Sequence, residues 1–135
     1  MRYRIQAIDG IGPVHASKLL EAGITTTSAF LKCCRCPKGR EALSRKTTIS
    51  THLLFKWAKS ADLIRISGIC LQFTRLLKAT GVNTASELKR YKPEDLAAKM
   101  AKINARRRIC RLSPGTSLVS QWIAKARIAG PAIRH

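Results

Sequence analysis

The feature that most constrains this fold is a sequence pattern that occurs twice, 58 positions apart. The first copy is Ile8-Asp9-Gly10-Ile11-Gly12 and the second is Ile66-Ser67-Gly68-Ile69-Cys70. In each copy a further glycine, Gly23 or Gly81, follows 13 positions after the central glycine, and a pair of leucines lies between the two. A fixed-offset repeat indicates repeated supersecondary units. We therefore expect two tandem repeats, residues 1–65 and 66–135, that pack as one compact domain.

The sequence around the repeats favours helices over strands. Strictly alternating runs of β-branched residues are hard to find, and aromatic residues make up only 5% of the chain, so the core is expected to be aliphatic. Pro13 and Pro93 are expected at helix starts, and Thr84 with Glu87 matches a capping box. Each half ends in a stretch that carries a tryptophan. These observations predict an all-α fold.

Further helix boundaries follow from local signals. Residues 32–40 are expected to form a break, followed by a helix over residues 40–46 and another over residues 51–60. Ser50 is expected to cap the second of these. A long basic helix is expected over residues 99–112.

The charge of the chain is extreme. It contains 26 Lys and Arg residues against 7 Asp and Glu, a net charge of +19. Residues 1–65 contribute +8 and residues 66–135 contribute +11, so the excess is built into both repeats. A folded domain of this kind repels itself unless an acidic partner neutralises it. Nucleic acid is the commonest such partner, followed by an acidic protein surface or an anionic membrane.

Several features bear on the compartment. No run of residues approaches the length of a membrane-spanning helix, and the first residues lack the apolar stretch of a secretory signal. No helix shows the separate basic and apolar faces of an interfacial anchor. Five cysteines, two of them adjacent, do not suggest a disulfide framework. We expect a protein of the cytoplasm or the soluble interior of an organelle, not a secreted one.

The first glycine turn has the pattern of a helix-hairpin-helix motif. Its two glycines allow a close approach of the backbone, and free N–H groups at the following helix start suit a phosphate. The second turn has Cys70 where the first has Gly12, and the cysteine Cβ leaves less room for a phosphate to approach the backbone. The expected phosphate-binding residues are Gly10, Ile11, Gly12, Lys18, Gly68 and Arg75.

Two basic clusters add to these turns. Clustered cations near few acids are typical of a surface that follows a phosphate backbone. The denser cluster comprises Lys99, Lys102, Arg106, Arg107, Arg108 and Arg111. The second comprises Arg35, Lys38, Arg40, Arg45 and Lys46, beside a segment that lacks the turn glycine of a groove-reading helix pair, so we expect no base-specific readout there.

Metal binding and catalysis find little support. Cys33 and Cys36 form a C-x-x-C, but no second pair of ligands occurs at zinc spacing. Arg35 and Lys38 are expected to favour the thiolate in the cluster of Cys33, Cys34 and Cys36. The few acids form no pair for acid–base chemistry, and no Asp closely follows either turn, as a hairpin-type DNA glycosylase would need. We expect a non-enzymatic protein without a cofactor or bound metal.

Taken together, these motifs resemble an uncharacterised helix-hairpin-helix family of bacterial type, known only as a domain of unknown function. The resemblance spans nearly the whole chain. It rests on both glycine turns, on Gly39-Arg40-Glu41-Ala42-Leu43, on Ala61-Asp62-Leu63-Ile64-Arg65 and on Trp122-Ile123-Ala124-Lys125-Ala126. It also includes Trp57, Leu76-Leu77, Gly81-Val82-Asn83-Thr84, Pro93-Glu94-Asp95-Leu96, Asn104 and Pro131. The resemblance implies a tandem-hairpin, all-α fold and no chemistry.

The chain departs from this family in three respects. Cys70 and Thr48 replace glycines, and Lys78 and Asn83 stand where acidic residues are usual. The loss of glycines makes phosphate binding by the turns less favourable, whereas the loss of acidic residues makes binding to an acidic partner more favourable. We expect phosphate binding to DNA or RNA without sequence readout, mainly through surface charge. The alternatives are an adaptor that docks on an acidic protein within a larger assembly and, more remotely, a ribosomal component.

Overall fold

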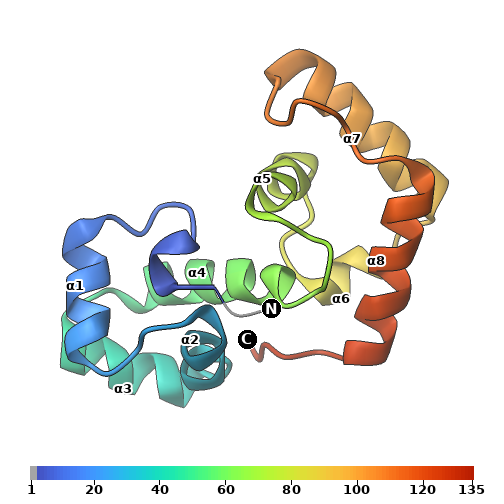
Figure 1. Cartoon of the computed structure of the whole chain (residues 1–135). Helices are drawn as coiled ribbons and strands as arrows, with labels where there is room; N and C mark the ends of the chain where they lie inside the picture. The colour runs from blue at the N-terminus through green and yellow to red at the C-terminus, as the bar shows by residue number, and fades with distance from the viewer. Residues whose placement is uncertain (1–2) are drawn as a thin grey trace. The chain divides into compact units, whose positions relative to one another are not determined.

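The computed structural model describes residues 3–135, and the regular structure in that range is helical (Figure 1). Eight α-helices and one 3-10 turn occur there, with a single isolated bridge between Arg4 and Thr26. The predicted all-α class is therefore confirmed. The chain divides into two compact units. The first contains the residues up to Arg65 together with Ala132–His135, and the second contains Ile66–Pro131.

The first unit is built on contacts among its helices. Its elements are η1 (Ile5–Ala7), α1 (Pro13–Glu21), α2 (Thr27–Cys34), α3 (Pro37–Thr47) and α4 (Thr51–Ile64). Helix α2 packs against α3, α4 and η1, and α3 also packs against α4. Phe30, Leu54 and Trp57 are buried between these helices, which gives the unit its apolar core.

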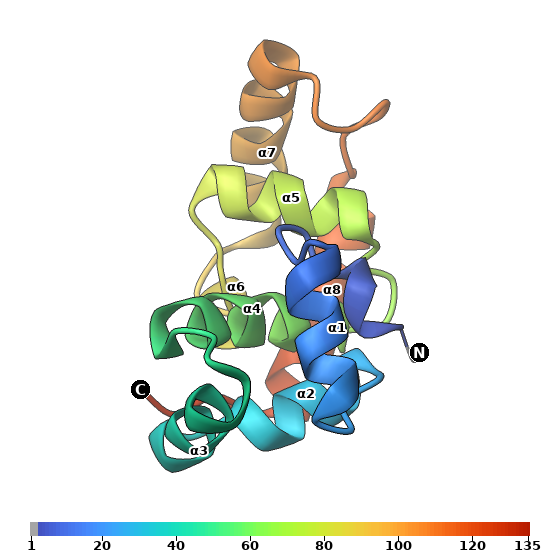
Figure 2. The same ribbon diagram turned by 90° about the vertical axis from the view of Figure 1, so that its left-hand side faces the viewer.

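The second unit begins at the second glycine turn and uses four helices. They are α5 (Leu71–Thr80), α6 (Ala85–Leu88), α7 (Pro93–Arg107) and α8 (Thr116–Ala129). Helix α7 packs against α5 and α8, and α6 packs against α8; Figure 2 shows α7 crossing α5. The core residues Leu76, Met100 and Trp122 are fully buried.

Local sequence signals explain where most helices start. The side chains of Thr26 and Ser50 accept hydrogen bonds from the Ala29 and Leu53 N–H groups, at 3.1 and 3.2 Å. Such N-caps satisfy N–H groups that have no partner within the helix. Pro13, Pro37 and Pro93 each stand at a first helical position, where a missing N–H has no cost.

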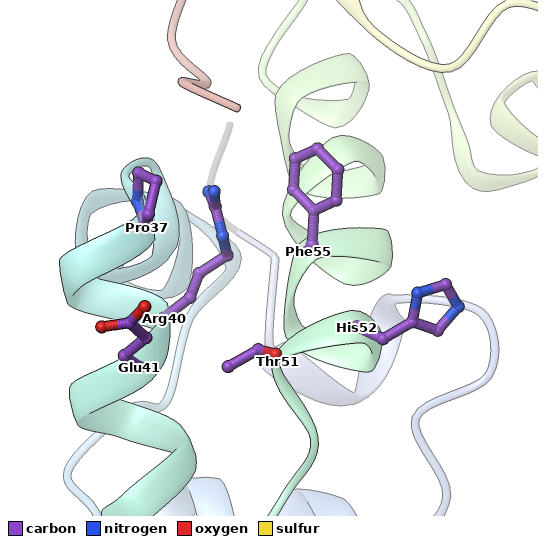
Figure 3. Close-up of a pocket in the computed structure, with 6 residues that line it drawn as sticks. All are labelled: Pro37, Arg40, Glu41, Thr51, His52 and Phe55. Atoms are coloured by element: carbon purple, nitrogen blue, oxygen red, sulfur yellow. The ribbon is translucent and has the colours of Figure 1, made fainter.

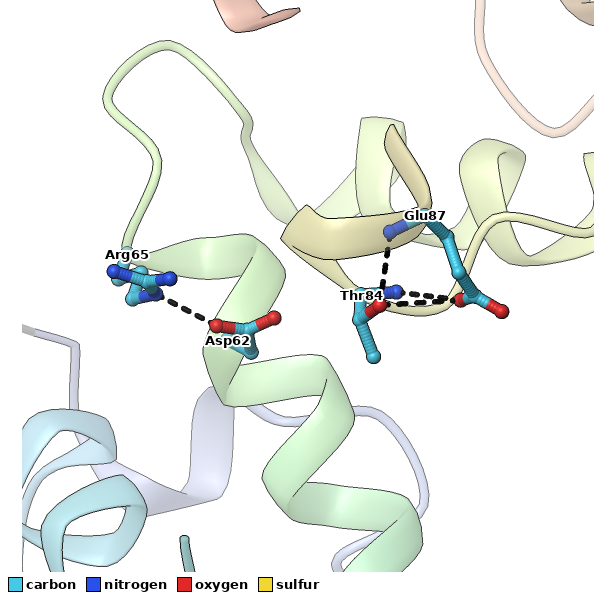
Figure 4. Close-up of polar contacts among 4 residues, drawn as sticks. All are labelled: Asp62, Arg65, Thr84 and Glu87. Carbon is cyan, nitrogen blue, oxygen red and sulfur yellow. Dashed lines mark hydrogen bonds and ion pairs between the residues drawn. The ribbon is translucent and has the colours of Figure 1, made fainter. Parts of the chain in front are cut away.

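The capping box at α6 is confirmed. The Glu87 N–H donates to Thr84 Oγ1 at 3.2 Å, and the Thr84 N–H donates back to Glu87 Oε2 at 3.0 Å (Figure 4). Each residue thereby satisfies a backbone donor of the other.

Three expected boundaries were wrong. Helix α3 begins at Pro37, because proline at the first position starts the helix inside the segment expected as a break. Helix α4 runs unbroken to Ile64, and Arg65, which caps it, donates from Nε to Asp62 at 2.7 Å (Figure 4). Helix α7 ends at Arg107 instead of continuing to residue 112, since Arg108 adopts a left-handed conformation with φ 50°.

The last residues pack on the first unit, although the repeat pattern assigns them to the second half. The Arg134 N–H donates to the Arg35 carbonyl at 2.6 Å, and the His135 ring lies edge-on to Phe55 at a centroid distance of 5.2 Å. Among residues 3–135, no helix combines the length and apolar character needed to cross a membrane.

Candidate nucleic-acid interface

The first glycine turn, Ile8–Gly12, leads directly into α1. Gly10 has φ +92°, a conformation that side chains rarely adopt, and the Ile11 N–H donates to the Ile8 carbonyl at 3.2 Å. Ile8 and Ile11 are buried, so they anchor the turn while Gly10 stays exposed. Gly12 caps α1 without a side chain, which leaves the first N–H groups of the helix open to an external acceptor.

A buried tryptophan supports this turn from below. A Cβ on Gly10 would lie 3.6 Å from Trp57 Nε1, an ordinary contact distance, so the turn packs over the indole and its positive φ is what favours glycine. The His15 ring lies 5.2 Å from the Trp57 ring, measured between centroids. Because α4 carries Trp57, the turn is fixed to the core of its unit.

The second glycine turn, Ile66–Cys70, has the same construction. Gly68 has φ +96°, and a Cβ there would lie 3.3 Å from Trp122 Nε1. The Phe73 ring lies 5.1 Å from the Trp122 ring, and Phe73 stands 58 positions after His15. Gly68 therefore lies in a tighter contact with its tryptophan than Gly10 does.

Lys125, on α8, contacts the second turn, and the sequence did not predict this contact. Its Nζ donates to the Ser67 carbonyl at 3.0 Å, so a cation lies directly on the turn. Its position three residues after Trp122 on α8 was the available signal, because such a spacing puts both side chains on one helix face. Trp122 Nε1 is buried and has no hydrogen-bond partner among the described residues.

The other residues expected at the turns are positioned as follows. Lys18 lies on α1, and its Nζ donates to Thr48 Oγ1 at 3.1 Å, so it joins α1 to the residue after α3. Arg75 is exposed on α5. Cys70 caps α5 with φ −84° and ψ 174°, close to the −79° and 174° of Gly12. A Cβ is therefore compatible with that backbone position.

The denser basic cluster lies on the solvent side of α7 and on the residues after it. Leu96, Ala97 and Met100 form the buried face of the helix. The spacing of Lys99, Lys102 and Arg106 sets them along one stripe. The exposed members of the cluster are Lys99, Lys102, Arg106, Arg107, Arg108 and Arg111. No acid occurs between Leu96 and Leu112.

The loop after α7 is held in a defined conformation. The Asn104 side chain accepts from the Cys110 N–H at 2.8 Å and donates to its carbonyl at 3.0 Å. Arg111, expected on the helix, lies in this loop. The chain turns out of α7 because these two bonds replace helical ones.

The second basic cluster loses one expected member. Arg40 is only 5% exposed, and its guanidinium donates to the carbonyls of Cys34 and Arg134 at 2.9 and 2.8 Å. It also lies 4.6 Å from the centre of the Phe55 ring (Figure 3). Arg40 is thus a structural residue and does not present its charge to a ligand. The remaining members, Arg35, Lys38, Arg45 and Lys46, are exposed.

The buried Cys34 does not behave as expected. Burial raises the pKa of the Cys34 thiol, and the adjacent Cys33 raises it further. Burial likewise raises the pKa of Cys110, with a smaller effect from Cys70. The expected thiolate is therefore wrong for Cys34. Within residues 3–135, no three His, Cys, Asp or Glu side chains cluster as metal ligands would.

Comparison with known protein families identifies a match over most of the chain. No curated protein and no solved structure matches this chain. A family model described as a domain of unknown function, DUF4332, matches residues 9–128. The matched region includes residues 9–12 of the first glycine turn, the whole second turn, both buried tryptophans and all of α7. Because it covers most of the sequence, the chain belongs to the DUF4332 family.

Proposed function

We propose that this protein binds nucleic acid through its phosphates, largely without sequence specificity, using helix-hairpin-helix-type turns and a basic surface. The observation that carries the proposal is the exposure of all six cations on α7 and its following loop, in a segment free of acids. Lys and Arg side chains that neutralise phosphates release counterions, and this release drives binding that does not depend on sequence.

The glycine turns supply a second kind of phosphate contact. The Gly10-Ile11-Gly12 turn, which is exposed at Gly10, leads into the nine-residue α1, where N–H groups and the helix dipole favour an anion. The turn at Gly68 adds the Lys125 ammonium group. Backbone donors of this kind position a phosphate chain and carry no base information.

Fluorescence anisotropy of a labelled random duplex, measured over a range of salt concentrations, tests the proposal. We expect affinity to fall steeply with salt, and Lys102→Gln with Arg106→Gln to reduce the slope of log affinity against log salt by about 2. The matched control is Lys56→Gln with Arg127→Gln, which removes two exposed cations elsewhere. An equal loss in both double variants would refute a site on α7.

Gly12→Ala separates the role of the first turn in binding from its role in folding. A Cβ at Gly12 meets nothing within 4 Å, and its φ of −79° suits alanine. We expect unchanged stability and weaker duplex binding, because the methyl group obstructs the approach to the α1 N–H groups. Gly10→Ala is the contrasting variant, since its φ of +92° predicts a loss of about 1–2 kcal/mol in unfolding free energy.

A negative binding result would favour the alternative partner, an acidic protein. If the folded protein binds neither DNA nor RNA at low salt, its positive charge serves an acidic protein surface, and the adaptor hypothesis replaces this one. Binding that is equally tight at low and high salt would also contradict phosphate-driven recognition.

A further inference from the structure

A cavity in the first unit has three positively charged residues among those that line it. It has a volume of about 260 Å³ and lies between α2, the end of α4 and Ala132. Lys32 lies in the last turn of α2, Arg35 caps that helix and Arg65 caps α4. All three side chains line the cavity, and none of its lining residues is an acid.

The nearest acid described beside this cavity is Asp62, which is buried and bonds Arg65 Nε at 2.7 Å (Figure 4). This ion pair orients the Arg65 guanidinium and offsets one of the three positive charges. A net positive potential remains around the cavity, and an anion entering it would gain from that potential.

The other lining residues suit a small polar anion. Leu31 and Ala61 provide apolar walls, which strengthen electrostatic attraction by excluding water. Thr27 and Ser28 add hydroxyl groups that can donate to an oxygen. The first N–H groups of α2 are already engaged, because the Thr27 N–H donates to the Tyr3 carbonyl at 2.9 Å and Ala29 donates to Thr26. An anion in this cavity would therefore be bound by side chains and not by the first N–H groups of α2.

Two other hollows in the same unit lack this character. The one in Figure 3 is lined by Arg40, whose guanidinium is occupied by carbonyls, and by the acidic Glu41. The one beside Gly12 has no charged lining residue. Of these three hollows, the one between α2 and the end of α4 has the most positively charged residues in its lining.

We propose that this cavity binds a phosphate dianion, either free or as the terminal monoester of a nucleotide chain. Such a group carries close to two charges near neutral pH and can form several charge-assisted hydrogen bonds. An internal phosphodiester carries only one charge, so it gains less from the three cations that line the cavity. This site is independent of the basic surface of α7.

The experiment uses two probes on the full chain. Inorganic phosphate, titrated at constant ionic strength and followed by amide NMR shifts, is expected to give saturable changes at residues 27–35 and at Arg65. Separately, a 5′-phosphorylated oligonucleotide is compared with the same strand bearing a 5′-hydroxyl. Lys32→Gln with Arg35→Gln is expected to weaken phosphate binding at least about tenfold, since each charge-assisted bond contributes substantially. Arg45→Gln with Lys56→Gln is the control of equal charge.

The outcomes separate the sources of the phosphate. Saturable shifts that the lining variant abolishes establish a site for free phosphate, and a 5′-phosphate advantage abolished by the same variant establishes a site for a strand terminus. The proposal is overturned if neither effect appears, or if the lining and control variants lose binding equally. The 5′-hydroxyl strand alone tests general nucleic-acid binding, so the two proposals can fail separately.

Discussion

Within residues 3–135, two residues other than glycine hold a left-handed backbone, and each ends a helix. Thr48 follows α3 with φ 62°, and Arg108 follows α7 with φ 50°. In both cases the N–H donates to a carbonyl four residues earlier, Ser44 or Asn104, at 2.8 Å. A side chain at such a position is strained, because its Cβ approaches the following backbone. The strain is concentrated where each unit reverses direction before its tryptophan-bearing helix.

Thr48→Gly is therefore expected to stabilise the protein. Relief of the left-handed strain, set against the greater flexibility of glycine in the unfolded chain, predicts a gain of about 0.5–1 kcal/mol in unfolding free energy. Thr48→Ala keeps the strain and removes the bond from Lys18 at 3.1 Å, so it is the control. Urea denaturation measures both variants, and a stability of Thr48→Gly no higher than that of Thr48→Ala would contradict the assignment.

The buried Cys34 predicts a loss of stability at alkaline pH. Its folded pKa is raised above the usual 9.0 by burial and by Cys33, so the thiol contributes stability that is fully present below the pKa of the unfolded state. As pH rises above about 9, the unfolded chain loses this proton first, and stability falls by up to about 1.4 kcal/mol per pH unit.

Comparing wild type with Cys34→Ala isolates this contribution from the titration of lysines and tyrosines. We expect Cys34→Ala to show a shallower decline in unfolding free energy between pH 8.5 and 10.5, measured by denaturant titration. Parallel curves for the two proteins would show that Cys34 ionises equally in both states.

At the scale of elements, the connection between α2 and α3 depends on one glycine. Gly39 lies in the first turn of α3, and a Cβ there would stand 1.9 Å from the Cys33 carbonyl oxygen at the end of α2. No L side chain fits without moving backbone, so Gly39 sets how closely these two helices meet.

Gly39→Ala is expected to destabilise the protein by at least about 2 kcal/mol, since the methyl group forces a backbone shift in a packed region. Gly115→Ala provides the control, because Gly115 precedes α8 with φ −80° and a Cβ there meets nothing within 4 Å. Thermal unfolding of both variants distinguishes them, and similar melting temperatures would disprove the close approach of α2 and α3.

The helices that the sequence predicted correctly begin at residues that cap the helix or start it with a proline. Pro13, Ser50 and the Thr84–Glu87 capping box all mark real helix starts, since capping acts within four residues. The end of α7 was missed because it depends on Asn104 bonding Cys110, six residues away. The role of Arg40 was missed because its carbonyl partner at Arg134 is 94 positions away. Hydrogen bonds of this kind depend on the tertiary fold, so no local sequence pattern predicts them.

For the molecule as a whole, charge opposes compactness in both units. The first unit, residues 1–65 with Ala132–His135, carries +9, and the second unit, Ile66–Pro131, carries +10. Self-repulsion of this kind is screened by salt and removed by a bound polyanion. The same charge that favours phosphate binding therefore destabilises the free protein. Contacts between segments that are distant in the sequence oppose this repulsion.

The segment Ala132–His135 provides such a contact. Its carbonyls at Arg134 and His135 accept from Arg40 Nη2, at 2.8 and 3.4 Å. Without them, the buried guanidinium keeps the Cys34 carbonyl and the Phe55 ring but loses the other acceptors. An incompletely bonded buried cation costs about 1–3 kcal/mol.

A chain that ends at Pro131 is thus expected to lose about that much stability in the first unit alone. Hydrogen exchange should speed up for amides of α3 and α4 while those of α5 and α7 keep their protection, because units open separately when their contacts are separate. Arg134→Ala in the full-length chain tests whether the backbone is responsible: it keeps both carbonyls and should leave exchange in α3 unchanged. Faster exchange in both units after truncation would instead mean that the segment stabilises the molecule as a single cooperative body.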